Sequence, residues 1–166
     1  MLEIHSQTLD DAKGSMRGND YYNPSSVTLA IETAQRDACA NKAYQFLVKY
    51  RGVIVGRANL SSVARSYYNK ASLGYRIGQG FGGNGHATKA AELVLAKART
   101  ELDFWRIEAT VRLDNHGSAH VLLNNDFLAY GTTQRSMKLH GVWYDLRHFE
   151  RNLASCASAR RCSLHT

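Results

Sequence analysis

The stretch from Gly78 to Ala87, "GQGFGGNGHA", contains five glycines in ten residues. Glycine adopts backbone angles that other residues resist, and it lets a ligand approach the main chain closely. The stretch leads into an alanine-rich helical pattern, and backbone N–H groups at a helix N-terminus form an anion site. The residues therefore predict a loop that binds a phosphate or a pyrophosphate.

Two common phosphate loops do not fit. A P-loop closes on Gly-Lys-Ser or Gly-Lys-Thr, whereas here Gly85 is followed by His86 and Ala87. Residues 80–85 match the dinucleotide pattern G-x-G-x-x-G, but no acidic residue closes the next strand and the preceding strand is half polar. The loop therefore favours a pyrophosphate ligand other than a P-loop nucleotide or a dinucleotide.

The loop needs a strand before it and a helix after it. In residues 71–78, Leu73, Tyr75 and Ile77 alternate with small or polar residues, which predicts a strand. Residues 87–102 place their apolar side chains on one helical face. A second strand, "WRIEATV", alternates four apolar residues with polar ones: Trp105, Ile107, Ala109 and Val111. Strand, loop, helix and strand form a βαβ unit with a parallel pair.

The residues before and after this unit predict two β-hairpins and one further helix. "YQFLVKY" and "VIVGRANL" are joined by Arg51-Gly52, and a second hairpin turns at His140-Gly141. A helix is predicted after Pro24, with Ser25 or Ser26 as its N-cap. Leu2, Ile4 and Leu9 suggest a short first strand.

A short helix is predicted after "LDNHGS". Asp114 or Asn115 would cap it, and Ala119, Leu122 and Leu123 would form its buried stripe. Trp143, in the second hairpin, is expected in the core. The predicted strands outnumber the predicted helices, and the sheet is expected to be mixed.

Length and composition indicate a single domain over residues 1–153 and a loose basic tail over residues 154–166 of the 166. No apolar run spans a bilayer and no signal pattern is visible, so we expect a cytoplasmic protein with no membrane partner. Three scattered cysteines predict no disulfide framework. A net charge of +7 favours acidic partners, a phosphorylated cofactor and nucleic acid among them.

Residues 73–98 followed by 105–131 resemble the GNAT acetyltransferases, specifically the RimJ/RimL-type branch that acetylates the N-termini of ribosomal proteins. The family's pyrophosphate loop, Gln/Arg-x-x-Gly-x-Gly/Ala, falls on residues 82–87, with Gly82 in place of Gln or Arg. The branch's Asn-x-x-Ser falls on Asn115 to Ser118, and its following Gly-Phe is here Asp126-Phe127. The motif Gly141-x-Trp143-x-Asp145 also fits the branch.

The resemblance implies a mixed, mostly antiparallel α/β sheet with a splayed parallel pair and helices on both faces. It implies acetyl-CoA as acetyl donor, with the pantetheine arm along the strand that holds Tyr75, Arg76 and Ile77 and backbone N–H groups of that strand facing the thioester oxygen. The cofactor-binding residues of the loop would be Gly82, Gly83, Asn84, Gly85, His86, Ala87 and Thr88.

The resemblance also assigns candidate catalytic groups. Ser118 would protonate the departing thiolate or merely cap its helix, and Asn115 would bind the pantetheine amide, cap the helix, or do both. Glu108 is a candidate base or water-holder, or else a surface residue paired with Arg106 or Arg76.

Other polar and aromatic residues are given weaker roles. His116 and His120 have metal-capable spacing but lack a third ligand nearby, so no metal site is predicted. Tyr67 and Tyr68 are either a substrate-side rim or plain hairpin-edge residues.

The sequence therefore predicts an N-acetyltransferase that acts on a primary amine, most simply a protein or peptide N-terminal amine of the ribosomal-protein type. A polyamine, an aminoglycoside and aminoacyl-tRNA are alternative acceptors. A non-catalytic basic module that binds coenzyme A or RNA is the alternative from another class. The sequence leaves both a monomer and a homodimer open.

Overall fold

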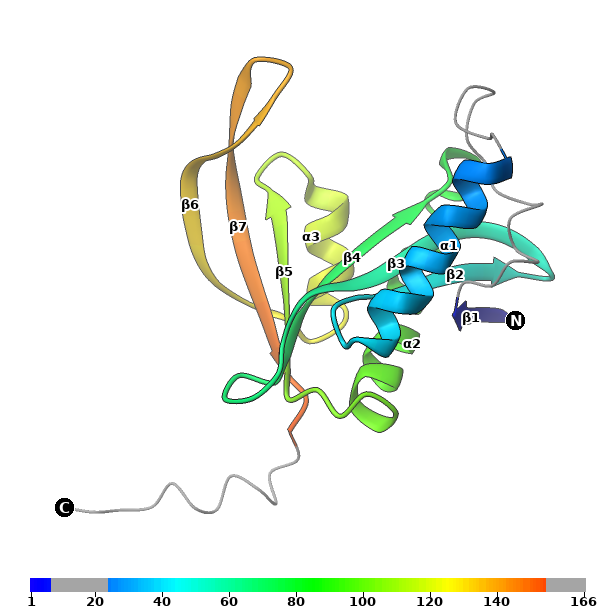
Figure 1. Ribbon diagram of the computed structural model, residues 1–166. Helices are drawn as coiled ribbons and strands as arrows, with labels where there is room; N and C mark the ends of the chain where they lie inside the picture. The colour runs from blue at the N-terminus through cyan, green and yellow to red at the C-terminus, as the bar shows by residue number, and fades with distance from the viewer. Residues whose placement is uncertain (7–23, 155–166) are drawn as a thin grey trace.

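The predicted βαβ unit lies at the centre of the molecule (Figure 1). It consists of β4 (Lys70–Ile77), α2 (His86–Thr100) and β5 (Arg106–Arg112). The two strands are parallel but pair only where residues 70–72 face residues 106–108. Beyond these pairs the strands separate, so a split opens in the middle of the sheet.

The computed structural model describes residues 1–6 and 24–154, and their strands form one sheet in the order β1-β2-β3-β4-β5-β7-β6. All neighbours other than β4 and β5 are antiparallel. The outer strands are β1 (Leu2–Ser6), β2 (Tyr44–Tyr50), β3 (Val53–Ala64), β6 (Leu128–Leu139) and β7 (Val142–Asn152). This confirms the mixed, mostly antiparallel sheet with a splayed parallel pair.

Both predicted hairpin turns are present. Arg51 and Gly52 have φ values of 51° and 79°, and His140 and Gly141 have values of 48° and 84°. Two consecutive residues with positive φ match the twist of antiparallel strands, and this explains why each turn ends in glycine. The second hairpin is long and carries β6 at the edge of the sheet.

Helices lie on both faces of the sheet (Figure 1), and the burial of β2 reflects this. Phe46, Leu47 and Val48 are all buried although neighbouring side chains on a strand point to opposite faces. The helix α1 (Pro24–Cys39) contacts β2, whereas α2 packs on β1, β3 and β4. The third helix, α3 (His116–Leu123), contacts α2 and β5.

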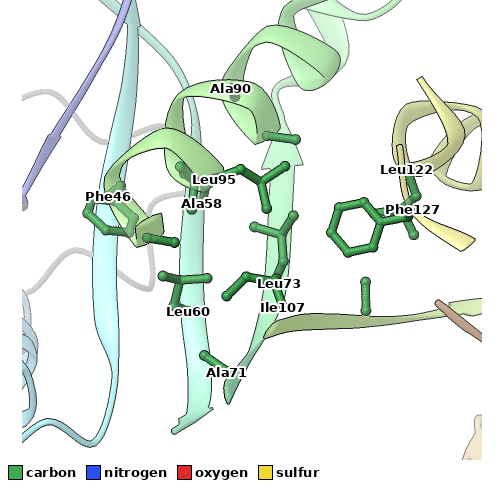
Figure 2. Packing of buried hydrophobic residues seen from close by; sticks show 14 of the residues in the cluster. Phe46, Ala58, Leu60, Ala71, Leu73, Ala90, Leu95, Ile107, Leu122 and Phe127 are labelled. Carbon is green, nitrogen blue, oxygen red and sulfur yellow. The ribbon is translucent and has the colours of Figure 1, made fainter. Parts of the chain in front are cut away.

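The core is formed between α2 and the strands around the split. The buried face of α2 combines three alanines with two larger residues: Ala90, Ala91, Val94, Leu95 and Ala98. Alanine lets the helix approach the sheet closely, and Leu60, Leu73 and Ile107 fill the space beneath it (Figure 2). Lys89, Glu92 and Lys97 lie outside this buried face, as the periodicity predicts.

The strand predicted to include Trp105 begins one residue later, at Arg106. Three further sequence expectations, on burial and capping, are wrong. Trp143 is 54% exposed because the outer hairpin extends past the core. Leu123 is 52% exposed because it ends a short helix that buries Leu122. The first long helix begins at Pro24, so the two serines after it lie within its first turn and do not cap it.

The paired end of β4 and β5 is fastened by a polar network. The Asn69 carbonyl accepts the Trp105 N–H, and the Asn69 side chain donates to the Asp103 carbonyl. Arg65 donates to both Asn69 Oδ1 and the Leu102 carbonyl, each at 2.8 Å, and its guanidinium stacks on Phe104. The loop before β4 and the loop before β5 are thus joined at this end, whereas the other end of the strand pair diverges.

Two predictions fall on residues that the structure does not describe: Leu9 in the first strand and the basic tail beyond Ala154. Across residues 1–6 and 24–154, no helix is long and apolar enough to cross a membrane.

Candidate active site

The glycine loop leads from β4 into α2 without a side-chain cap. It contains a short turn, η3 (Gln79–Phe81), and Gly85 occupies the N-cap position of α2 with a φ of 72°. Gly83 has a φ of 78°, and a Cβ on either glycine would meet no neighbouring atom. The glycines are therefore required by backbone conformation, and they leave open space before the first N–H groups of the helix.

A cleft of about 710 Å³ begins at this loop and runs between β4 and α3. All but one of the predicted cofactor-binding residues line it: Tyr75, Arg76, Ile77, Gly82, Gly83, Gly85, His86, Ala87, Thr88 and Asn115. Asn84 is outside the lining, and its Nδ2 donates to the Gly82 carbonyl at 3.2 Å. Asn84 therefore holds the shape of the loop through this bond.

His86 is the first residue of α2 and packs on β2. Its ring lies 4.7 Å from the Tyr50 ring, and the Arg51 guanidinium lies 5.2 Å from the same tyrosine. Two cationic or potentially cationic side chains thus stand beside the anion-binding end of the cleft.

Ser118 and Tyr75 meet at the inner end of the cleft. The Tyr75 hydroxyl is 2.8 Å from Ser118 Oγ, and it donates to the Ser118 carbonyl at 3.1 Å. Burial raises the pKa of Tyr75, so its phenol stays neutral and can donate a hydrogen bond. Asn115 caps α3, because its Oδ1 accepts the Ser118 N–H at 3.0 Å.

The split between β4 and β5 forms a second, smaller cleft of about 270 Å³. Leu73 to Tyr75 line one wall and Ala109 to Arg112 the other. Tyr75, Asn115 and Ser118 line both clefts, so the two meet at these residues. Among the described residues, the β4 edge that faces the split has no strand partner beyond Ser72, because β3 pairs with the opposite edge.

Glu108 is outside the lining of both clefts. Lys70 Nζ lies 3.0 Å from each of its carboxylate oxygens, and Arg106 Nε donates to it at 3.0 Å. Burial acts to raise the pKa of Glu108, but hydrogen bonds from Arg106 and Lys70 outweigh it and hold the pKa below its usual value. The structure therefore places this candidate base in an ion-pair cluster, and one of its partners is Lys70, not Arg76.

Other predicted residues are distributed as follows. Tyr67 and Tyr68 are exposed, lie next to the paired end of β4 and β5 in the chain, and line neither cleft. His120 lines the larger cleft, whereas His116 does not. Within the described residues, no three His, Cys, Asp or Glu side chains gather in a group that could hold a metal ion.

Sequence reasoning missed Thr110 and Arg112 in the wall of the split. The alternation of "WRIEATVR" places both on the strand face that also carries Glu108, and this signal was present in the sequence. Their partners on β7 were not visible there, because they depend on a register that joins residues 38 positions apart, such as Thr110 and His148.

A loop that exposes helix N–H groups, followed by a cleft that enters a split sheet, suits a donor with a pyrophosphate and a long arm. A family model described as an acetyltransferase (GNAT) domain matches residues 3–128. The chain belongs to this family, which confirms the resemblance seen in the sequence. It is an acyltransferase, and acetyl-CoA is its acetyl donor.

Individual relatives agree with this assignment. Probable N-acetyltransferase YjcK of Bacillus subtilis (strain 168) is 30% identical over 146 residues, which are 87% of this chain and 81% of that protein. Mycobacterium smegmatis RimJ, solved in complex with CoA-disulfide, shares the fold with a TM-score of 0.81 at 23% identity, over 91% of this chain and 81% of that one. Mutant forms of the spermidine/spermine N-acetyltransferase SpeG from Vibrio cholerae have a TM-score of 0.77 at 17% identity, over 97% and 99% of the two chains.

Proposed function

We propose that this acetyltransferase modifies the α-amino group at the N-terminus of a protein, of the kind that ribosomal proteins present in the cytoplasm. The observation that carries the choice of acceptor is the charge of the two cleft linings. Arg76 lines the larger cleft and Arg112 the smaller one, and neither lining contains an Asp or Glu among the described residues. A polycation such as spermidine would meet arginines and no carboxylate there, whereas a peptide presents a single amine that can be neutral and needs no acidic site.

The open face of the outer hairpin also suits a polypeptide. Along β6, ten of the residues from Leu128 to Lys138 are exposed and Met137 is half-buried. Figure 1 shows α1 over the half of the sheet that holds β2, and β7 and β6 in the other half, so an extended acceptor would lie against the exposed residues of β6.

The proposed donor geometry uses the two clefts in turn. The pyrophosphate would bind the backbone N–H groups from Gly83 to Thr88 at the start of α2. The pantetheine arm would hydrogen-bond to the free β4 edge near Tyr75 and Ile77. The thioester would then lie where the clefts meet, beside Ser118.

The reaction is a direct transfer. The neutral amine attacks the thioester carbonyl, its oxygen is stabilised by backbone N–H groups of β4, and the C–S bond then breaks. Ser118, which is hydrogen-bonded to Tyr75, would give the thiolate a proton. Because a thiol has a pKa near about 8.5, this proton is a modest aid.

A panel of amines tests the acceptor. Acetyl-CoA is mixed with a peptide that has a free N-terminal alanine, the same peptide with a blocked N-terminus and an internal lysine, and spermidine, and thiol release is followed. We expect turnover with the free N-terminus and little with the other two. Turnover on spermidine alone would replace the proposed acceptor with a polyamine.

A further inference from the structure

A chain of three polar side chains crosses from the split to the outer strands. His148 of β7 lies between two threonines: Thr133 Oγ1 is 2.8 Å from its Nε2, and Thr110 Oγ1 is 3.4 Å from its Nδ1. Thr110 lines the split, and Thr133 is exposed on β6. The chain therefore connects the centre of the sheet with solvent.

The register of the strands places this chain on the side opposite the donor cleft. Thr110 alternates with Ala109 and Val111, which are buried, and it pairs directly with His148. Tyr75 and Ser118 approach the split from the side of α3. An acceptor that enters from the other side would meet Thr110 first.

Most charged side chains near His148 form ion pairs with each other. On β5, Arg106 and Glu108 form an ion pair that also includes Glu150 of β7. Arg112, at the other end of β5, pairs with Asp114. From β6, the Tyr130 ring lies 5.8 Å from the imidazole. The lowered pKa of Glu108 makes that carboxylate a weak base, whereas an imidazole can accept a hydrogen bond at one nitrogen while it donates from the other.

We propose that Thr110, His148 and Thr133 form the route by which the acceptor amine loses its proton; this rests on the proposed function. As the amine nitrogen bonds to the thioester carbon, it passes one proton to the Thr110 hydroxyl, which passes its own to His148 Nδ1. The imidazolium then releases its Nε2 proton through Thr133 to solvent. The electron pair of the broken C–S bond leaves on sulfur, and the thiolate takes a proton from Ser118, which regains one from solvent through the Tyr75 hydroxyl.

In this route Thr110 is the group that touches the acceptor, and His148 acts through it. The imidazole is the Nε2–H tautomer, which donates to Thr133 and accepts from Thr110. A purely structural role for His148 would require only that the two hydrogen bonds be kept, and it would leave the pH dependence of the reaction unchanged.

The test is the pH profile of kcat/KM with acetyl-CoA and the peptide with a free N-terminal alanine, over about pH 6 to about pH 9. We expect His148→Gln to lower kcat/KM about 100-fold near neutral pH and to leave an acidic limb that follows ionisation of the amine alone. The deficit should be smaller at high pH, where hydroxide can take the proton that the amine releases. Added imidazole should restore part of the activity of His148→Ala.

Two further variants and a control complete the test. Thr110→Val should behave like His148→Gln, and Thr110→Ser, which keeps the hydroxyl, should retain activity even if the histidine variants fold poorly. His140→Asn, at the turn of the same hairpin, should match the unmodified protein. A profile unchanged in His148→Gln, or equal rates for Thr110→Val and Thr110→Ser, would overturn the inference alone. Absence of turnover on every amine in the unmodified protein would overturn the proposed function and the inference together.

Discussion

Near Lys70 and Arg106, β4 and β5 pair in register and are joined by ion pairs and loop hydrogen bonds; near Ile77 and Arg112, the same two strands diverge around a cleft. At the closed end the polar groups bind one another: Asn69, Arg65 and Glu108 all have partners within the protein. At the open end, helix N–H groups and a strand edge are left without protein partners among the described residues.

This difference shows how a family of enzymes can keep an opening in a sheet without losing the sheet. A strand edge exposed in the middle of a protein is costly unless the surrounding elements hold it in place. Here the closed end and α2 supply that support, so the open end is prepared for the donor before it binds.

The largest effect should follow from disturbing the open end at Gly85. Gly85→Val forces a β-branched residue to a φ of 72°, a strain of about 1–3 kcal/mol that the loop can relieve only by turning its N–H groups away. We expect coenzyme A to bind at least about 100-fold more weakly in calorimetry, with folding retained.

Gly80→Ala is the matched control, because Gly80 lacks a positive φ and has open space around it. Equal affinities for Gly85→Val and the unmodified protein would contradict the proposed pyrophosphate site.

Disturbing the closed end should cost stability and spare donor binding. Asn69→Ala removes a buried side chain that bonds to Arg65 and the Asp103 carbonyl, so we expect a loss of about 2 kcal/mol in the free energy of unfolding by urea. Asn124→Ala, an exposed asparagine at the end of α3, should change stability little. A large change in coenzyme A affinity in Asn69→Ala would show that the two ends are not separable.

A smaller effect is expected at the point where the two clefts meet. Ser118→Ala should lower kcat about tenfold with little change in the KM for acetyl-CoA, because the hydroxyl acts only as the thiolate departs. Adding Tyr75→Phe should cost less than the sum of the two single changes, because each single change already removes the hydrogen bond that joins the two hydroxyls. An unchanged kcat in Ser118→Ala would leave the Ser118 hydroxyl with its hydrogen bond to Tyr75 alone, since Asn115 is the residue that caps α3.

The smallest effect concerns the ion pairs of the closed end and depends on pH. Because the folded-state pKa of Glu108 is lowered, its charge stabilises the fold above the unfolded pKa, and that stability is lost as the pH falls through the folded value. Glu108→Gln should therefore cost about 1 kcal/mol at neutral pH, after allowance for the exposed Arg106, and nothing in strong acid.

Glu101→Gln, in an exposed pair with Lys97, should cost less than about 0.5 kcal/mol. A deficit in Glu108→Gln that persisted in acid would show that packing, not charge, is what the carboxylate contributes.

The glycine loop, α2 and the cap of α3 could largely be predicted from residues that are close in the sequence. The loop glycines, the helix that follows and the Asn115 cap all depend on residues within a few positions of one another, and local periodicity and turn chemistry determine such features. The surroundings of Trp143 and Glu108 could not be predicted in the same way. Trp143 is exposed and Glu108 is paired with Lys70, and the periodicity of neighbouring residues shows neither contact.

By itself, the sequence determined the order of strands and helices, the positive-φ turns at Gly52 and Gly141, and the glycine loop that leads into α2. Only the tertiary structure decided that Tyr75 meets Ser118 and that Thr110 meets His148. The physical reason is distance along the chain: these contacts join residues that are 43 and 38 positions apart, and they exist because β4 and β5 diverge and β7 pairs in one register.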